Sequence, residues 1–268
     1  MSVTRETEVI AKIKQKQITD LISRGRRLDG RSLFDYREIK VETGVIEKAE
    51  GSASVSLGDT KILAGVKIEI GEPFPDTPDE GVLTVNAELV PLASATFELG
   101  PPDENAIELA RVVDRGLRES KTIDLKKLCI NPGKKVFVVF IDIYVLDHDG
   151  NLTDASAIAA LAALINAKMP TYEIKAGEVE LKPEYIQLPL QNYPFTVTMA
   201  KIGNKLVVDP IIEEEQVMDA QITVTTDQNG NICAMQKSGP KAFSITHVLE
   251  AVDLAREKAK HIRAILGV

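Results

Sequence analysis

The sequence predicts a mixed fold of strands and helices in which each half of the chain consists of several strands followed by a helix. Two stretches carry this prediction. In the first, a nearly unbroken apolar run from Val136 to Leu146, typical of a central strand buried on both faces, precedes a glycine turn and an alanine-rich helix. In the second, two strand pairs precede a helical pattern from Ile245 to Leu266. The shared order is compatible with internal duplication, which residue identity is too low to establish.

The composition limits the kind of protein. The chain has 268 residues, 44% of them hydrophobic, enough for one large domain or two fused ones with a sizeable core. Its net charge of −8 argues against a surface that binds nucleic acid all over, because phosphate neutralisation dominates such binding. A local basic stripe remains possible. No apolar run has the length of a membrane span or a signal peptide, so we expect no membrane contact and a cytoplasmic location.

Residues that could hold a metal or form a catalytic dyad are scattered along the chain. Cys129 and Cys233 stand alone, and the three histidines, His148, His247 and His261, lie at no metal-ligand spacing. The sequence therefore predicts that both cysteines are small buried hydrophobic residues. It predicts no metal site and no catalytic dyad.

The N-terminal segment has an amphipathic helical pattern. Apolar residues recur between charges from Thr4 to Ser23, and we expect residues 1–25 to form a helical arm. An arginine cluster around Asp29-Gly30 follows, and its members are Arg24, Arg26, Arg27, Arg31 and Arg37. On sequence alone this cluster is either a solvated surface or a contact for nucleic acid or a partner, and both interpretations stay open.

Alternating and β-branched runs predict strands in both halves. In the first half, Ser52–Leu57 and Thr60–Ile70 flank the two-residue turn Gly58-Asp59, and Thr84–Val90 is a further strand. In the second half, two pairs of strands flank turns at residues 203–204 and 227–230. These strands are Phe195–Ala200, Lys205–Asp209, Gln221–Thr226 and Ile232–Gln236.

A helix is predicted from its N-cap Asp103, directly after two prolines, to about Ser120. At about 100° per residue, one face is apolar and the opposite face carries a charged stripe. The apolar face holds Ala106, Leu109, Ala110, Val113 and Leu117, and the stripe holds Glu108, Arg111, Arg115 and Arg118. Surface arginines on helices are more often solvated or paired with nearby acids than functional, so the pattern by itself favours that interpretation over RNA contact.

The turn between the apolar run and the alanine-rich helix is typical of an anion site. Residues 148–151 form the turn, Thr153 is the expected N-cap, and the helix runs from Ala155 to Ala167 before Pro170 stops it. The positive end of a helix and its free N–H groups attract anions. Asp154 in the first turn satisfies that end from within the chain and would repel phosphate, so the sequence predicts a closed site.

Three ordered motifs resemble the RNase PH family of phosphorolytic exoribonucleases: RRLDGRSLFDYREI, EGSASVSLGDTKILAGV and DHDGNLTDASAIAALAAL. Within the family, the third motif and the N-terminal helix are similar to the non-catalytic RNase PH-type subunits of archaeal exosomes. The resemblance implies an α+β RNase PH-type fold of two similar β-rich halves with packed helices, preceded by an N-terminal helix. We expect the two RNase PH-like domains at residues 26–190 and 191–268.

The chain departs from the pattern of active family members where they carry out chemistry. Active members bind the attacking phosphate with Thr or Ser and Arg at the start of the alanine-rich helix, where this chain has Asp154 and no arginine. They also carry two aspartates near the positions of Glu215 and Gln221, and Gln221 cannot act as a general acid. The run from Glu213 to Glu215, with Asp219, is predicted to be a solvated acidic loop rather than a metal site. We therefore expect no catalytic residue in this chain.

The same resemblance favours RNA contact for the arginine stripe, because the equivalent helix of the family lies beside the RNA path. Arg111, Arg115 and Arg118 are the candidate RNA-binding residues. The resemblance implies a non-catalytic subunit that forms a hetero-hexameric ring, a trimer of dimers, with a catalytic RNase PH-like paralogue. Single-stranded RNA would be shortened from its 3′ end at the paralogue's site with inorganic phosphate. This chain would need no cofactor, and RNA-binding cap subunits would be further partners.

Two other interpretations stay open on sequence alone. One is a self-sufficient phosphorolytic exoribonuclease that assembles as a homo-hexamer, and the other is a purely architectural subunit. The absence of a phosphate-binding arginine near Asp154 disfavours the homo-hexameric exoribonuclease. The second differs from the leading interpretation only in whether the arginines matter.

Overall fold

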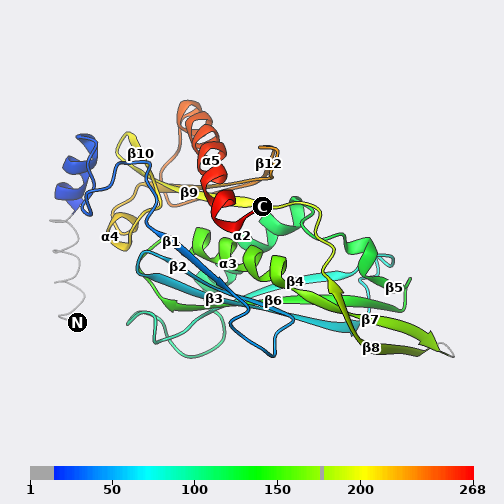
Figure 1. Ribbon diagram of the computed structural model, residues 1–268. Coiled ribbons are helices and arrows are strands. Elements are labelled where there is room, and N and C mark those ends of the chain that lie inside the picture. Colours follow the sequence, from blue (N-terminus) through cyan, green and yellow to red (C-terminus); the bar gives the residue numbers. More distant parts are fainter. Residues whose placement is uncertain (1–14, 176–177) are drawn as a thin grey trace.

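The computed structural model describes residues 15–175 and 178–268 and has the predicted mixed α+β fold (Figure 1). Its larger sheet has the strand order β1-β2-β3-β6-β4, with β5 also paired to β6. The strands are β1 (Ile39–Thr43), β2 (Gly51–Leu57), β3 (Thr60–Gly71), β4 (Val82–Leu89), β5 (Cys129–Asn131) and β6 (Lys135–Asp147). Neighbours are antiparallel except β4 and β6, which run parallel. The predicted hairpin is confirmed, with Gly58 at φ +57° in its turn.

Strand β6 is central, as predicted, but it is not buried on both faces. Val139, Ile141 and Ile143 are at most 1% exposed, whereas the alternate residues, such as Phe140 and Tyr144, are only half-buried. The reason is that helices cover one face of the larger sheet, and connecting loops cover the other face incompletely (Figure 1). The prediction of burial on both faces is therefore wrong for one face of β6, which the rest of the chain covers only in part.

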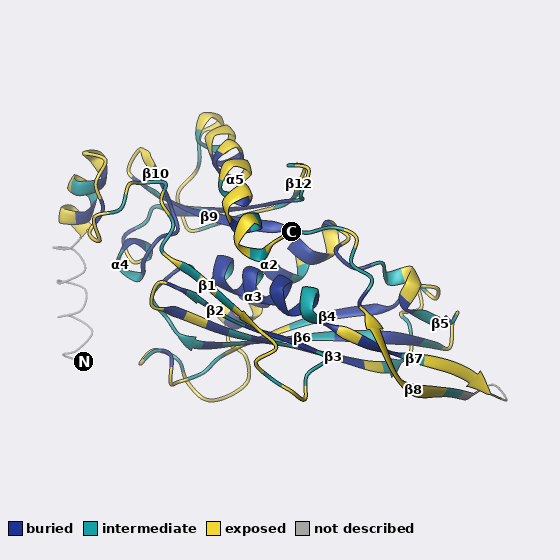
Figure 2. Cartoon of the chain, in the orientation of Figure 1, coloured by how far each residue is buried: buried dark blue, intermediate teal, exposed yellow. Residues whose placement is uncertain are grey.

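Helix α3 (Leu152–Asn166) lies between the two sheets and is buried over most of its length (Figure 2). Its alanines permit this, because small side chains let both sheets approach the helix. At Gly51 on β2, an added Cβ would lie 2.4 Å from Ala163 O and 2.7 Å from Ala167 Cα. The helix ends at Asn166 with Ala167 as C-cap, so Pro170 is not what stops it.

The smaller sheet has the order β10-β9-β11-β12 and is entirely antiparallel. Its strands are β9 (Phe195–Ile202), β10 (Lys205–Val208), β11 (Ala220–Thr226) and β12 (Ile232–Ser238), close to the predicted runs. Helix α5 (Ile245–Leu266) packs on it with the predicted bounds. One hydrophobic core joins residues of both sheets, among them Ile143 and Val197. The boundary between residues 190 and 191 thus stays a prediction.

Helix α2 (Glu104–Glu119) also has the predicted bounds. Asp103 caps it by accepting a hydrogen bond from Ala106 N at 2.8 Å, and the predicted apolar face is buried. The short helices η1 (Leu125–Leu128) and α4 (Ile212–Glu215) were not predicted.

The sequence also did not predict the two-stranded ribbon of β7 (Lys168–Lys175) and β8 (Glu178–Gln187). Most of this ribbon is exposed (Figure 2), so its residues lack the alternation between apolar and polar positions that marks a half-buried strand.

The N-terminal helix is confirmed over residues 15–23, and the rest of the predicted helix, from Thr4 on, lies outside the described residues. Ile18 and Ile22 are buried against Ile202 and Val207 of the β9–β10 hairpin. The arm therefore packs on the smaller sheet. Within the described part of the chain, no helix is long and apolar enough to cross a membrane.

Cys129 and Cys233 are free thiols, as their spacing predicts, but both are half-buried rather than buried. Burial, the largest cause, and the nearby carboxylates Asp79 and Asp227 respectively raise the pKa of each thiol. Neither thiol therefore has the lowered pKa that marks a reactive cysteine.

Candidate functional site

A buried ion pair connects the arginine cluster to the second half of the chain. Arg27 donates from Nε and Nη2 to the two carboxylate oxygens of Glu214 at 2.9 and 2.6 Å, and neither side chain is exposed. Arg27 also donates to the carbonyl oxygens of Val208 and Asp209. The prediction of a solvated acidic loop is therefore wrong for Glu214 and Glu215, which both lie in helix α4. Glu214 is buried and pairs Arg27 inside the protein, and Glu215 accepts a backbone hydrogen bond at the start of α3.

Two further arginines of the cluster bind Asp209, which is wholly buried after β10. Arg31 reaches its Oδ2 at 2.8 Å, and Arg37 reaches its Oδ1 at 2.7 Å. Burial alone would raise the pKa of Asp209, but the hydrogen bonds and charge of Arg37 lower it overall. Arg27, Arg31 and Arg37 connect the two halves of the chain, so they are neither a solvated surface nor a contact for nucleic acid or a partner. Arg24 and Arg26 are exposed.

The turn before α3 differs from the predicted one in its cap. Gly150 and Asn151 both have left-handed backbones, with φ +83° and φ +51°. An added Cβ at Gly150 would lie 2.6 Å from Pro210 O, so only glycine fits there. The N-cap is Asn151 and not Thr153, because asparagine tolerates the left-handed region and its side chain accepts from Asp154 N.

The Asp154 carboxylate does not bind the backbone N–H groups at the start of α3, which corrects the predicted basis of the closed anion site. Its carboxylate is wholly buried and accepts hydrogen bonds at Oδ2 from Tyr36 Oη, Asn151 Nδ2 and Thr198 N at 2.6, 2.9 and 3.0 Å. Burial raises its pKa to about 6, although these three donors oppose the shift. Within the core, Asp154 therefore connects helix α3 to Thr198 of strand β9 and to Tyr36, which precedes Arg37 of the arginine cluster.

Glu215 occupies the place at the start of α3 that an anion would take. Its Oε1 accepts a hydrogen bond from Asn151 N at 2.8 Å, so the chain's own carboxylate meets the positive end of the helix. Burial raises the pKa of Glu215 to about 7, partly offset by the hydrogen bond from Asn151 and the charge of Arg37. This residue comes from helix α4. The sequence named it only as part of the acidic run and, through the resemblance, as lying near a family aspartate, and did not predict its hydrogen bond to the start of α3.

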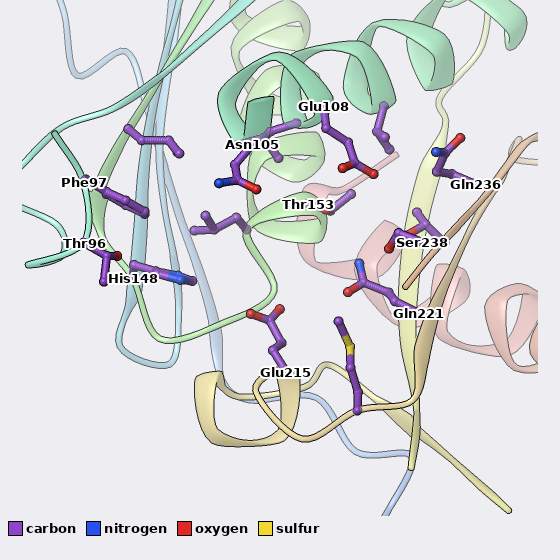
Figure 3. A pocket seen from close by; sticks show the side chains of 16 residues that line it. Thr96, Phe97, Asn105, Glu108, His148, Thr153, Glu215, Gln221, Gln236 and Ser238 are labelled. Atoms are coloured by element: carbon purple, nitrogen blue, oxygen red, sulfur yellow. The ribbon is translucent and has the colours of Figure 1, made fainter. Parts of the chain in front are cut away.

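A cavity of about 360 Å³ opens beside Glu215 and the first turn of α3 (Figure 3). Its polar lining consists of Thr96, Asn105, Glu108, His148, Thr153, Glu215, Gln221, Thr223, Gln236 and Ser238. No lysine or arginine among the described residues lines it. His148 stacks on Phe97 with 5.4 Å between ring centroids, and its Nδ1 accepts from Gly150 N. Burial and the charge of Arg37 lower the pKa of His148 and so favour its neutral form.

Glu215 and Gln221, which the resemblance places near the two aspartates of active members, both line this cavity. The described residues contain no cluster of three or more potential metal ligands. The cavity can accept hydrogen bonds and cations, but its charge opposes phosphate.

The arginine stripe of α2 lies next to this cavity. A second cavity, of about 390 Å³, is lined by Arg111 and Arg115 and shares Glu108 and Gln236 with the first. Arg111 and Arg115 are exposed, and Arg115 Nη1 donates to Gln236 Oε1 at 3.1 Å. Arg118 differs from them, because its guanidinium donates to both carboxylate oxygens of Asp114 and to Leu83 O.

We expect Glu215→Gln to stabilise the free chain at neutral pH. The raised pKa means that Glu215 contributes stability below about pH 4.5 that is lost as the pH rises to about 7. Glutamine keeps the acceptor for Asn151 N but does not ionise, so at pH 8 the variant should gain on the order of 1–2 kcal/mol. At pH 4 the two proteins should unfold alike.

The measurement for this variant is urea unfolding at both pH values. The matched control is Glu213→Gln, which removes another carboxylate of helix α4 and should change stability by less than about 0.5 kcal/mol at either pH. Asp154 titrates in every variant, so its contribution cancels in the comparison. An equal effect of Glu215→Gln at pH 4 and pH 8 would contradict the role assigned to burial.

The chain combines two sheets, an alanine-rich helix between them and a polar cavity at the start of that helix. Comparison with known proteins shows which family has this architecture. Residues 35–170 match domain 1 of the 3′ exoribonuclease family, known as RNase PH, and residues 192–258 match its domain 2. The chain belongs to this family.

Individual relatives and solved structures show which members of the family the chain is similar to. The chain is 57% identical to the exosome complex component Rrp42 of Thermococcus kodakarensis over 260 residues, covering 96% of each chain. It is 50% identical to the Rrp42 of Methanothermobacter thermautotrophicus over 261 residues, covering 97% of this chain and 96% of the relative. A chain of the Archaeoglobus fulgidus exosome with RNA bound to the active site superposes with TM-score 0.88 at 50% identity, covering 96% of this chain and 98% of that one.

Proposed function

We propose that this protein is a non-catalytic, RNA-binding subunit of an exosome ring. It alternates with a catalytic RNase PH-type paralogue in a hetero-hexamer and completes the paralogue's site for 3′-to-5′ phosphorolysis of single-stranded RNA. Inorganic phosphate is used by the paralogue, and this chain has no cofactor of its own. RNA-binding cap subunits are further partners of the ring.

The observation that carries the non-catalytic role is the hydrogen bond from Asn151 N to Glu215. Phosphorolysis needs a bound phosphate as the attacking group, and the start of α3 already holds a carboxylate. The adjoining cavity adds Glu108 and, among its described lining residues, no lysine or arginine that would draw phosphate in. Both features disfavour binding of the attacking group in this chain.

The assignment to an exosome rests on the relatives. Those matched over nearly the whole chain are named as exosome components, and the superposed structures are described as an exosome with RNA bound to the active site and as an archaeal exosome core. A self-sufficient homo-hexamer is not favoured by these matches. The half-covered face of the larger sheet and the exposed β7–β8 ribbon are consistent with a chain that is further covered by other subunits.

The RNA-binding role rests on α2. Arg111 and Arg115 are four residues apart on its exposed face and line one cavity, so both guanidinium groups can reach phosphates of the same strand. Arg118 lies on the same stripe, but Asp114 and Leu83 O already occupy its donors. We therefore rank Arg118 below the other two as an RNA contact.

The purified chain alone is expected not to shorten RNA in the presence of phosphate, whereas its mixture with the catalytic paralogue should release nucleoside diphosphates. The matched control is the paralogue alone, which shows how much activity requires this chain. Phosphate-dependent release of nucleoside diphosphates by the chain alone would overturn the proposal. So would a chain that stays apart from the paralogue during co-purification.

A further inference from the structure

An acidic cavity adjoins a second cavity of mixed charge on one face of the protein. The carboxylates of the first cavity are Glu108 and Glu215, and the second is lined by Arg111 and Arg115 together with Glu104 and Glu108. They adjoin, because Glu108, from α2, and Gln236, from β12, line both. The function proposed above uses the arginines but gives the acidic cavity no ligand.

The two carboxylates approach the acidic cavity from different elements. Figure 3 shows Glu108 extending from α2 on one side and Glu215 from α4 on the other, with Gln221 and Thr153 between them. Within residues 15–175 and 178–268, neither carboxylate is within salt-bridge distance of a lysine or arginine. Burial raises the pKa of Glu215 to about 7, so a cation entering the cavity would stabilise its ionised form.

The chemistry of the lining selects among ligands. Phosphate and other anions would meet two carboxylates. A metal ion is disfavoured, since the described residues hold no cluster of three or more potential ligands. A guanidinium or ammonium group suits the cavity best, because Gln221 offers a further acceptor oxygen beside the two carboxylates.

The source of such a group follows from symmetry, and this step rests on the proposed function. Two subunits of the same fold that meet about a two-fold or pseudo-two-fold axis present equivalent surfaces to each other. In the proposed ring, Arg111 and Arg115 of α2 reach the paralogue's site. By the same symmetry, the paralogue's helix that corresponds to α2 reaches the corresponding place on this chain, which is the acidic cavity. A face with adjacent acidic and basic regions is complementary to such a counterpart.

We propose that the cavity between α2, α4 and the start of α3 receives a cationic side chain of the adjoining RNase PH-type subunit, and that Glu108 and Glu215 bind it. The cavity at the family's catalytic position thus serves as a subunit contact in this chain.

The test is the double variant Glu108→Gln, Glu215→Gln in the full chain, titrated with the purified catalytic paralogue from the same organism. The control, Glu250→Gln, Glu257→Gln, removes two exposed carboxylates of α5 and changes the net charge equally. We expect the cavity variant to bind the paralogue at least about tenfold more weakly at low salt, with a smaller difference at high salt. The control should bind like the wild type.

A second readout separates binding from folding. Because Glu215→Gln is expected to stabilise the free chain at neutral pH, weaker binding by the cavity variant cannot be attributed to unfolding. NMR of carboxyl-labelled glutamate should also show the pKa of Glu215 falling when the paralogue binds.

The outcomes distinguish this inference from the proposed function. If the wild-type chain does not associate with the paralogue, both are overturned. If the cavity variant and the wild type associate equally tightly, only the cavity inference is overturned. If the intact ring loses RNA affinity while subunit affinity is unchanged, the cavity binds RNA and the inference is likewise overturned.

Discussion

Glu214→Ala is expected to lower the free energy of unfolding by about 3–5 kcal/mol, because it leaves the buried charge of Arg27 without its partner. Both side chains are inaccessible to solvent in the structure. The carbonyl oxygens of Val208 and Asp209 would still accept hydrogen bonds from Arg27, but they cannot neutralise its charge. Urea unfolding of the free chain measures the loss.

Glu213→Ala is the matched control, since it removes a carboxylate from the adjacent position, where the side chain is half-buried, and should change stability by less than about 0.5 kcal/mol. Glu214→Gln should fall between the two, as it keeps the shape of the acceptor but not its charge. If Glu214→Ala costs no more than the control, the Arg27–Glu214 pair does not hold the two halves together.

The double variant Arg111→Ala, Arg115→Ala is expected to assemble with the paralogue but to bind single-stranded RNA about a hundredfold more weakly at low salt. Each lost hydrogen bond to a charged group corresponds to roughly a tenfold change in affinity. The loss should not depend on base sequence, since phosphates carry the contact. The slope of log affinity against log salt should become shallower by about 1.4, for two contacts of a single strand. Titrations of the intact ring across a salt series measure both quantities.

Two comparisons make this prediction specific. Lys205→Ala, Lys260→Ala removes two exposed cations elsewhere and should leave RNA affinity nearly unchanged. Arg118→Ala should have a smaller effect than either neighbouring arginine, because Asp114 holds its guanidinium. If RNA affinity and salt slope of the double variant equal those of the wild type, the stripe is a solvated or subunit-contacting face.

Elements with a regular local pattern could be predicted from the sequence. Helix α2 has the predicted N-cap and buried face, and α5 has the predicted bounds, because a helical period is set by residues three and four apart. The turns at Gly58 and Gly203 are equally local. The β7–β8 ribbon was missed, since its mostly exposed strands show no pattern of burial.

The candidate site could be predicted only in part. The turn at residues 148–151 and the arginine stripe are short segments whose residue types indicate their place, and the sequence found both. The carboxylate that blocks the anion site was predicted to be Asp154, because that residue lies in the first turn of the helix. In the structure Asp154 turns into the core to meet Tyr36 and Thr198, and another residue meets the start of α3.

By itself the sequence determined the α+β fold class, the bounds of helices α2 and α5 and the position of the anion-type turn, since interactions between near neighbours specify all three. Only the tertiary structure decided which charges meet. Glu215 lies 64 residues from the Asn151 N–H that it accepts from, and Arg27 lies 187 residues from Glu214. Such pairs form because packing of the two sheets around α3 brings their segments together, and buried charges are stable only where a partner is in reach.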